Sequence, residues 1–136
     1  MKTQWNFSEQ GTIESHGGKI WYGISGSEKS SETPLIVIHG GPGMSHSYLY
    51  PLTDLADERQ VIFYDQLDAG LSERPNNPVN WRISRFLLEV DDLRESLNLD
   101  RVAIFGNSWG GTIAASYAAK NPAGLERLVL SSPLLN

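Results

Sequence analysis

The feature that most constrains this chain is an abrupt change from strand to helix around a serine. Residues 102–105 form an apolar run of β type, and they lead into a Gly-Asn-Ser-Trp-Gly turn at residues 106–110. Residues 112–120 then have the composition of a helix. Glycines on both sides of the turn allow a strand and a helix to approach closely, so the pattern predicts a strand, a sharp turn that presents Ser108, and a helix.

The rest of the chain alternates short apolar runs with segments of helical spacing. Glycines at the 16–18 turn predict a hairpin near the N-terminus, and the continuous apolar runs predict strands that are buried on both faces. The predicted strands are 11–15, 19–24, 34–38, 60–64, 101–105 and 125–130. The predicted helices are 47–56, 83–97 and 109–120, with loop over 65–80. In the first helix, Pro51 is expected to be tolerated only near the first turn.

This alternation predicts an α/β fold with a doubly wound, mostly parallel sheet, extended by the N-terminal antiparallel hairpin. The 136 residues are enough for one domain. The apolar strand at 125–130 is expected to need neighbours that cover it, because an exposed apolar edge strand promotes association. We therefore expect residues 1–136 to be the N-terminal part of a single core domain whose later strands lie outside this sequence.

Composition excludes several classes of site. The chain has no cysteine, which excludes disulfides, thiolate metal sites and a cysteine nucleophile. Its formal net charge of −5 disfavours nucleic acid and anionic membranes as partners. The N-terminus has no apolar leader and no run is long enough for a membrane span, so a cytoplasmic protein is expected.

Ser108 is the candidate nucleophile. A Gly-x-Ser-x-Gly sequence between a strand and a helix holds its serine at a strained turn with the hydroxyl exposed above the sheet. Gly106 and Gly110 would remove side chains that clash as strand and helix pack together. A plain glycine-rich turn is an alternative interpretation. A dinucleotide site is disfavoured, because it requires glycine where Ser108 stands.

A second motif, His39-Gly40-Gly41-Pro42-Gly43, follows the predicted strand at 34–38. Glycines expose backbone N–H groups, and those of Gly41 and Trp109 are predicted to hold a developing oxyanion together. His39 is expected to anchor this loop through hydrogen bonds. A tight turn without catalytic function is the alternative.

A third motif begins with Asp65-Gln66, directly after the strand at 60–64. It is expected at the carboxyl edge of the sheet, where doubly wound folds place their sites. Asp65 is interpreted as a structural carboxylate that caps the loop. It is not assigned as the acid of a catalytic triad, because in this type of fold the acid and the histidine follow the serine in the chain.

Together these motifs resemble the prolyl iminopeptidase family of α/β-hydrolase-fold serine hydrolases. The resemblance rests on residues 39–43, on Asp65-Gln66 with Gly70 and Ser72, and on residues 106–111. It covers roughly residues 10–135, about the first half of a family member.

The resemblance implies an α/β-hydrolase fold with Ser108 as nucleophile and Gly41 and Trp109 as the oxyanion hole. It implies that an N-terminal residue, preferably proline, is released from a short peptide through an acyl-enzyme. It implies no metal and no organic cofactor. A helical cap that binds the free amine of the substrate would follow Asn136.

Two departures from the family weaken the expectation of a strict preference for proline. The family commonly has Arg-Gly after the Asp-Gln pair, whereas Leu67 and Asp68 follow it here. An esterase, lactonase or amidase on the same fold therefore stays open as an alternative.

The sequence after the serine lacks the groups that would activate it. Residues 109–136 contain no aspartate and no histidine, and His16, His39 and His46 all precede Ser108. A serine hydroxyl needs a general base to react near neutral pH. We therefore expect a C-terminal fragment or second chain to supply the acid and the histidine. The alternative from another class is a non-catalytic fragment that binds a partner through an exposed sheet edge.

Overall fold

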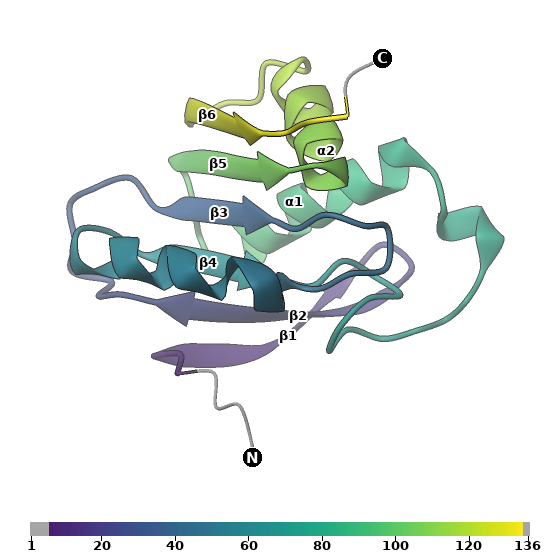
Figure 1. Cartoon of the computed structure of the whole chain (residues 1–136), viewed down its shortest axis with the longest axis horizontal. Coiled ribbons are helices and arrows are strands. Elements are labelled where there is room, and N and C mark those ends of the chain that lie inside the picture. The colour runs from purple at the N-terminus through teal and green to yellow at the C-terminus, as the bar shows by residue number, and fades with distance from the viewer. Residues whose placement is uncertain (1–5, 135–136) are drawn as a thin grey trace.

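In the computed structural model, which describes residues 6–134, a six-stranded mixed sheet carries helices on both faces (Figure 1). The strands are β1 (Glu9–Ser15), β2 (Gly18–Ser25), β3 (Leu35–Ile38), β4 (Val61–Tyr64), β5 (Val102–Asn107) and β6 (Leu125–Ser131). The helices are η1 (His46–Asp57), η2 (Pro78–Asn80), α1 (Ile83–Ser96) and α2 (Trp109–Ala118).

The strand order is β1-β2-β4-β3-β5-β6. Strands β4, β3, β5 and β6 run parallel, whereas β1 pairs antiparallel with β2, and β2 pairs antiparallel with β4. Ile36 is in register with Ile62 on one side and with Ile104 on the other. The fold is thus the predicted doubly wound, mostly parallel sheet with an N-terminal hairpin. The carboxyl ends of β3, β4 and β5 meet at one edge, where the loops that begin at His39 and Asp65 and the turn at Ser108 lie.

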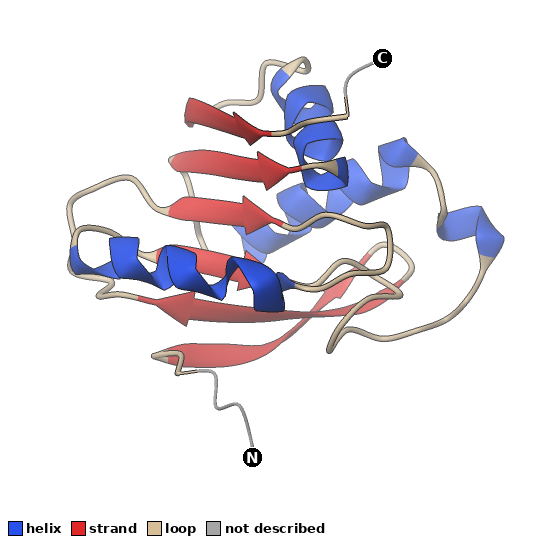
Figure 2. Cartoon of the chain, in the orientation of Figure 1, coloured by secondary structure: helices blue, strands red, loops and turns tan. Residues whose placement is uncertain are grey.

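Residues of the central strands alternate between two apolar layers. Ile36 and Ile38 pack with buried residues of α1 and α2. Leu35 and Val37 face the other way, into a layer covered by partly buried residues of η1. Figure 2 shows the same arrangement, with α1 and α2 behind the sheet and η1 in front of it. Burial on both faces explains why these strands are continuous apolar runs.

The segment predicted as a short helix over 47–56 winds as the 3-10 helix η1, and Pro51 lies inside it. The expectation that Pro51 is tolerated only near the first turn is therefore wrong. A 3-10 helix uses φ angles close to the value that the proline ring imposes, so the conformation suits the residue even though one N–H donor is missing. The side chain of Ser45 caps the helix by accepting the N–H of Ser47.

Strand β6 differs from its prediction in burial. It forms the edge of the sheet among the described residues, and the side chains of Leu128 and Val129 are 37% and 50% exposed. The prediction of a strand buried on both faces is wrong here, since no further strand of the described chain covers its outer side. The apolar sequence of β6 is thus left partly in contact with solvent.

Helix α1 buries the predicted apolar side chains Phe86, Leu87, Val90 and Leu93. It also buries a charged pair that the spacing did not indicate. The Nη2 atom of Arg85 lies 2.7 Å from Oε2 of Glu89, one turn later.

In residues 6–134, no helix combines the length and apolar character required to cross a membrane.

The layered core makes a stability prediction. Replacing Ile36, which is fully buried, with alanine should lower the free energy of unfolding by about 2–5 kcal/mol, because methyl groups leave a close-packed centre. Replacing the half-exposed Val129 with alanine should lower it by less than about 1 kcal/mol. Urea denaturation of both variants measures the difference. Equal losses would contradict the arrangement of strands described here.

Candidate active site

Ser108 occupies a strained turn between β5 and α2. Its φ is 55° and its ψ is −119°, a conformation that costs energy for a residue with a side chain. The backbone holds it there: its N–H donates to the carbonyl of Ser131 at 3.0 Å, and its own carbonyl accepts the N–H of Gly111 at 2.9 Å. The serine is therefore fixed at the carboxyl edge of the parallel strands, where β5 turns into α2 (Figure 1).

The glycines on both sides of Ser108 are required by close packing. A Cβ atom on Gly106 would overlap the carbonyl of Gly110, and one on Gly110 would overlap the carbonyl of Ile38. A Cβ on Gly111 would lie 2.8 Å from Cβ of Pro133. Backbones of β3, β5 and α2 thus touch directly, which brings the loop after β3 next to the serine.

That loop, residues 39–43, turns back beside Ser108. A Cβ atom on the buried Gly40 would lie 3.4 Å from Cβ of Ser108. Gly41 has a φ of 124°, which residues with a side chain rarely adopt. Trp109 is the first residue of α2, so its N–H has no carbonyl partner within the helix. The two predicted oxyanion donors therefore come from segments that flank the serine.

His39 and Gln66 hold the glycine loop. The N–H of Gln66 donates to Nε2 of His39 at 3.0 Å, so the ring proton is on Nδ1, which donates to the carbonyl of Gly40 at 2.6 Å. Burial lowers the pKa of His39 and favours this neutral form. The side chain of Gln66 donates to the carbonyl of His39 at 2.8 Å and accepts Nε1–H of Trp109 at 3.0 Å. Gln66 thus connects the glycine loop with the first residue of α2.

Asp65 binds neighbouring loops. Its Oδ1 accepts the N–H of His46 at 2.8 Å and lies 2.9 Å from Nδ1 of the same residue, while Oδ2 accepts the N–H of Leu71 at 2.9 Å. Burial on its own would raise the pKa of Asp65, but the hydrogen bonds from His46 and Leu71 outweigh burial and keep the pKa below its ordinary value. Asp65 is therefore an ionised anchor for the loops after β3 and β4.

The chain's three histidines each bond groups other than Ser108. His39 anchors the glycine loop, and the buried ring of His46 bonds Asp65 and stacks on Trp21 with centroids 4.4 Å apart. His16 lies on the exposed hairpin, with Nδ1 2.9 Å from the carboxylate of Asp92. The described residues accordingly place the serine and its glycine loop together without a histidine base.

A cavity of about 440 Å³ opens beside the glycine loop and the elbow. Its wall is largely apolar, with one carboxylate and one guanidinium. The lining residues are Pro42, Gly43, Gln66, Leu67, Asp68, Asn76, Trp81, Arg82, Ile83, Phe86 and Trp109. This volume lies within the usual range for small-molecule sites.

Asp68 has a structural function that the sequence did not indicate. Its φ is 67°, in the left-handed region that aspartate tolerates better than most residues. Its carboxylate accepts the N–H of Asn76 at 2.9 Å and Nε1–H of Trp81 at 3.2 Å. Asp68 thereby fixes the loop that forms one wall of the cavity. The signal available in the sequence was the carboxylate at a position where the family commonly has a different residue.

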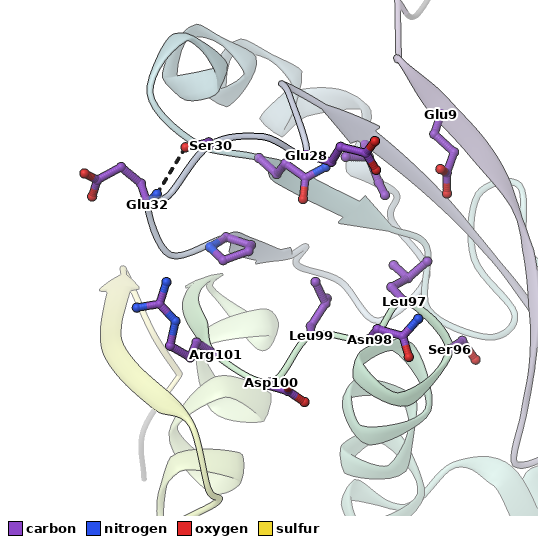
Figure 3. Close-up of a pocket in the computed structure, with 13 residues that line it drawn as sticks. Glu9, Glu28, Ser30, Glu32, Ser96, Leu97, Asn98, Leu99, Asp100 and Arg101 are labelled. Atoms are coloured by element: carbon purple, nitrogen blue, oxygen red, sulfur yellow. Dashed lines mark hydrogen bonds between the residues drawn. The ribbon is translucent and has the colours of Figure 1, made fainter.

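A second hollow of about 470 Å³ lies at the opposite edge of the sheet, where the parallel strands begin (Figure 3). Glu9, Glu28 and Glu32 contribute carboxylates to it, and Leu97 and Leu99 contribute apolar surface. It is separate from the elbow. Within residues 6–134, no group of three or more histidine, aspartate or glutamate side chains is arranged to hold a metal ion.

Comparison with known proteins agrees with this geometry. Residues 33–136 match the α/β hydrolase fold family. A proline iminopeptidase from Heyndrickxia coagulans is 44% identical over 127 residues, which are 93% of this chain and 44% of that protein.

Two crystal structures share the architecture at 35% sequence identity. The match to a proline iminopeptidase from Mycobacterium smegmatis has a TM-score of 0.82 and covers 88% of this chain and 42% of the Mycobacterium smegmatis chain. The match to the crystal structure of VinJ has a TM-score of 0.89 and covers 94% of this chain and 45% of the VinJ chain. The resemblance predicted from the three motifs is confirmed, and the chain spans a little under half the length of these relatives.

The glycine contacts predict a local sensitivity. Gly110→Ala should lower the free energy of unfolding by about 1–3 kcal/mol, because the new methyl group displaces α2 from β3. Gly11→Ala is the matched control, since that position on β1 lies outside the left-handed region and its closest neighbour is the Tyr22 side chain at 3.3 Å. Urea denaturation compares the two variants. A harmless Gly110→Ala would contradict the backbone contact.

The burial of His39 predicts a pH dependence. The pKa of His39 is lowered in the folded chain. At a pH below the ordinary pKa of 6.5, His39 is therefore protonated in the unfolded chain while it is still neutral in the folded chain. The stabilisation that His39 provides is therefore complete above about pH 6.5 and is lost as the pH falls.

The measurement is the free energy of unfolding of the parent and of His39→Asn at about pH 8 and about pH 5. The advantage of the parent should shrink toward pH 5. Glu89, whose pKa burial raises to about 7, titrates in both proteins and cancels in the difference. An advantage that stays constant would show that His39 is not held in its neutral form.

Proposed function

The chain belongs to the α/β hydrolase fold family, and from this membership we propose that it is the N-terminal part of a serine hydrolase of the proline iminopeptidase type. Ser108 is the nucleophile of this proposal. The observation that carries it is the strained turn that fixes Ser108 beside a glycine loop, at the carboxyl edge of the sheet. Such a backbone conformation costs free energy, and a serine with only a structural function would have no need of it.

In the proposed reaction, Oγ of Ser108 forms a bond to the carbonyl carbon of the substrate, and its proton passes to a general base. The carbonyl oxygen becomes negative and accepts the N–H groups of Gly41 and Trp109, each worth about 3 kcal/mol of barrier. The C–N bond then breaks, and the leaving amine takes the proton from the base. Water hydrolyses the resulting acyl-enzyme on Ser108.

A C-terminal fragment or second chain supplies the base and its acid in this proposal. Two observations support it: residues 109–136 contain no aspartate and no histidine, and the outer side of β6 is exposed. The relatives also extend well beyond the matched part, since the chain covers 44% of the Heyndrickxia coagulans protein. Residues 1–136 are then the N-terminal part of one core domain.

The proposed substrate is a short peptide or small amide with an N-terminal proline. The largely apolar cavity beside the elbow supports a small apolar residue, and the names of the relatives support proline. Leu67 and Asp68, which depart from the family's usual residues, favour other aminoacyl amides or small esters as the second candidate. A cytoplasmic location stays a prediction from the sequence.

A fluorophosphonate probe tests the nucleophile. The chain is co-expressed with the part of the Heyndrickxia coagulans proline iminopeptidase that lies beyond the match, and co-purification demonstrates assembly. We expect covalent labelling of the parent and none of Ser108→Ala. Ser96→Ala, an exposed serine at the end of α1, is the matched control and should be labelled like the parent.

Turnover by the same complex distinguishes the substrates. Faster cleavage of a proline anilide than of other aminoacyl anilides and phenyl esters supports the proposed specificity, and the reverse order supports the second candidate. An assembled complex in which the parent is not labelled contradicts the nucleophile. That outcome favours the non-catalytic interpretation, in which the exposed edge of β6 binds a partner.

A further inference from the structure

Tyr48, on η1, places its hydroxyl between the glycine loop and the elbow. Its Oη accepts the N–H of Gly40 at 2.7 Å, and its O–H donates to Oδ1 of Asn107 at 2.7 Å. Asn107 immediately precedes Ser108. The side chain of Tyr48 is therefore a direct link between the two segments that carry the proposed nucleophile and its oxyanion donors.

The hydrogen bond between Asn107 and Ser131 settles the direction of the two bonds that Tyr48 makes. The side-chain NH₂ of Asn107 donates to the carbonyl of Ser131 at 3.1 Å, and a carbonyl can only accept. Oδ1 of Asn107 must then face Tyr48 as an acceptor, so the tyrosine proton points to Asn107. The remaining lone pairs of the phenol oxygen are left for the N–H of Gly40.

This arrangement distinguishes between the two glycine amides of the loop. The N–H of Gly40 is occupied by Tyr48, so it is not available to a substrate oxygen. The N–H of Gly41 comes next in the loop and is the proposed donor. The contact also lies close to the nucleophile, because a Cβ atom on Gly40 would lie 2.8 Å from the Tyr48 hydroxyl and 3.4 Å from Cβ of Ser108.

We propose that Tyr48, acting through Asn107, is a positioning residue that locks the glycine loop to the nucleophile elbow and leaves Gly41 as the loop's oxyanion donor. The proposal deepens the proposed function and rests on it for its catalytic consequence. Tyr48 is not assigned an acid or base function, since its only proton is given to Asn107. Burial raises the pKa of Tyr48, which keeps the phenol protonated near neutral pH.

The kinetic test uses the assembled hydrolase described above and the variants Tyr48→Phe, Asn107→Ala and the double variant. Each single variant should lower kcat roughly ten- to a hundredfold and leave KM within about twofold, because a misplaced donor acts on the transition state. The double variant should lose no more than Asn107→Ala alone, because that change already removes the link that Tyr48 makes, together with the bond from Asn107 to Ser131.

Tyr22→Phe is the matched control, because it removes a hydroxyl that binds Glu9 on the exposed hairpin. It should retain the parent kcat. A Tyr48→Phe variant with the kcat of Tyr22→Phe would overturn the proposal, and so would losses that multiply in the double variant.

A second measurement is independent of catalysis. In the 136-residue chain, Tyr48→Phe should speed amide hydrogen exchange at Gly40 at least about tenfold, with no change at Ile104 in the core. Unchanged exchange at Gly40 overturns the link even where Ser108 is labelled. Faster exchange in a chain whose assembled complex is not labelled would instead locate the failure in the proposed function.

Discussion

The direct backbone contact between β3, β5 and α2 is the constraint on which this site depends. Gly106 and Gly110 leave no side chain between these elements, so the carbonyl of Ile38 lies against the first turn of α2. The chain that leaves β3 therefore emerges beside Ser108. A single methyl group at Gly110 would separate the two segments, and the glycine loop would no longer flank the serine.

The three glycines of residues 39–43 have no side chains that could hold the loop, so His39 and neighbouring residues must fix it. Three polar links do so, each to a different part of residues 39–48. His39 is held by Gln66, which also binds Trp109, and His46 is held by the ionised Asp65. Tyr48 ties Gly40 to Asn107. Gln66 and Asp65 are buried, whereas Tyr48 is 40% exposed. Together these links orient the proposed donors before any substrate arrives, which is the arrangement that favours oxyanion stabilisation.

Features encoded locally could be predicted from the sequence, and features set by distant partners could not. The strands and the elbow follow from apolar runs and from glycines at fixed spacing, which act within a few residues. The burial of Arg85 depends on Glu89 and on the carbonyl of His16, which is 69 residues away. Tyr48 meets Asn107 across 59 residues, and no spacing rule connects them. The exposure of Leu128 and Val129 follows from the place of β6 at the edge of the described sheet, which no local pattern reports.

In the proposed function, a single complement would cover the exposed edge of β6 and supply the general base. Strand β6 runs parallel to β5, and Ser131 at its carboxyl end holds both Ser108 and Asn107 by hydrogen bonds. Any further parallel strand that pairs with β6 would end at the same edge of the sheet as Ser108. A complement that covers Leu128 and Val129 would therefore deliver its own loops to the side of the serine opposite the glycine loop. Stability of the sheet and completion of the active site would then be gained in the same binding event, and a complement that failed to cover β6 would also fail to activate Ser108.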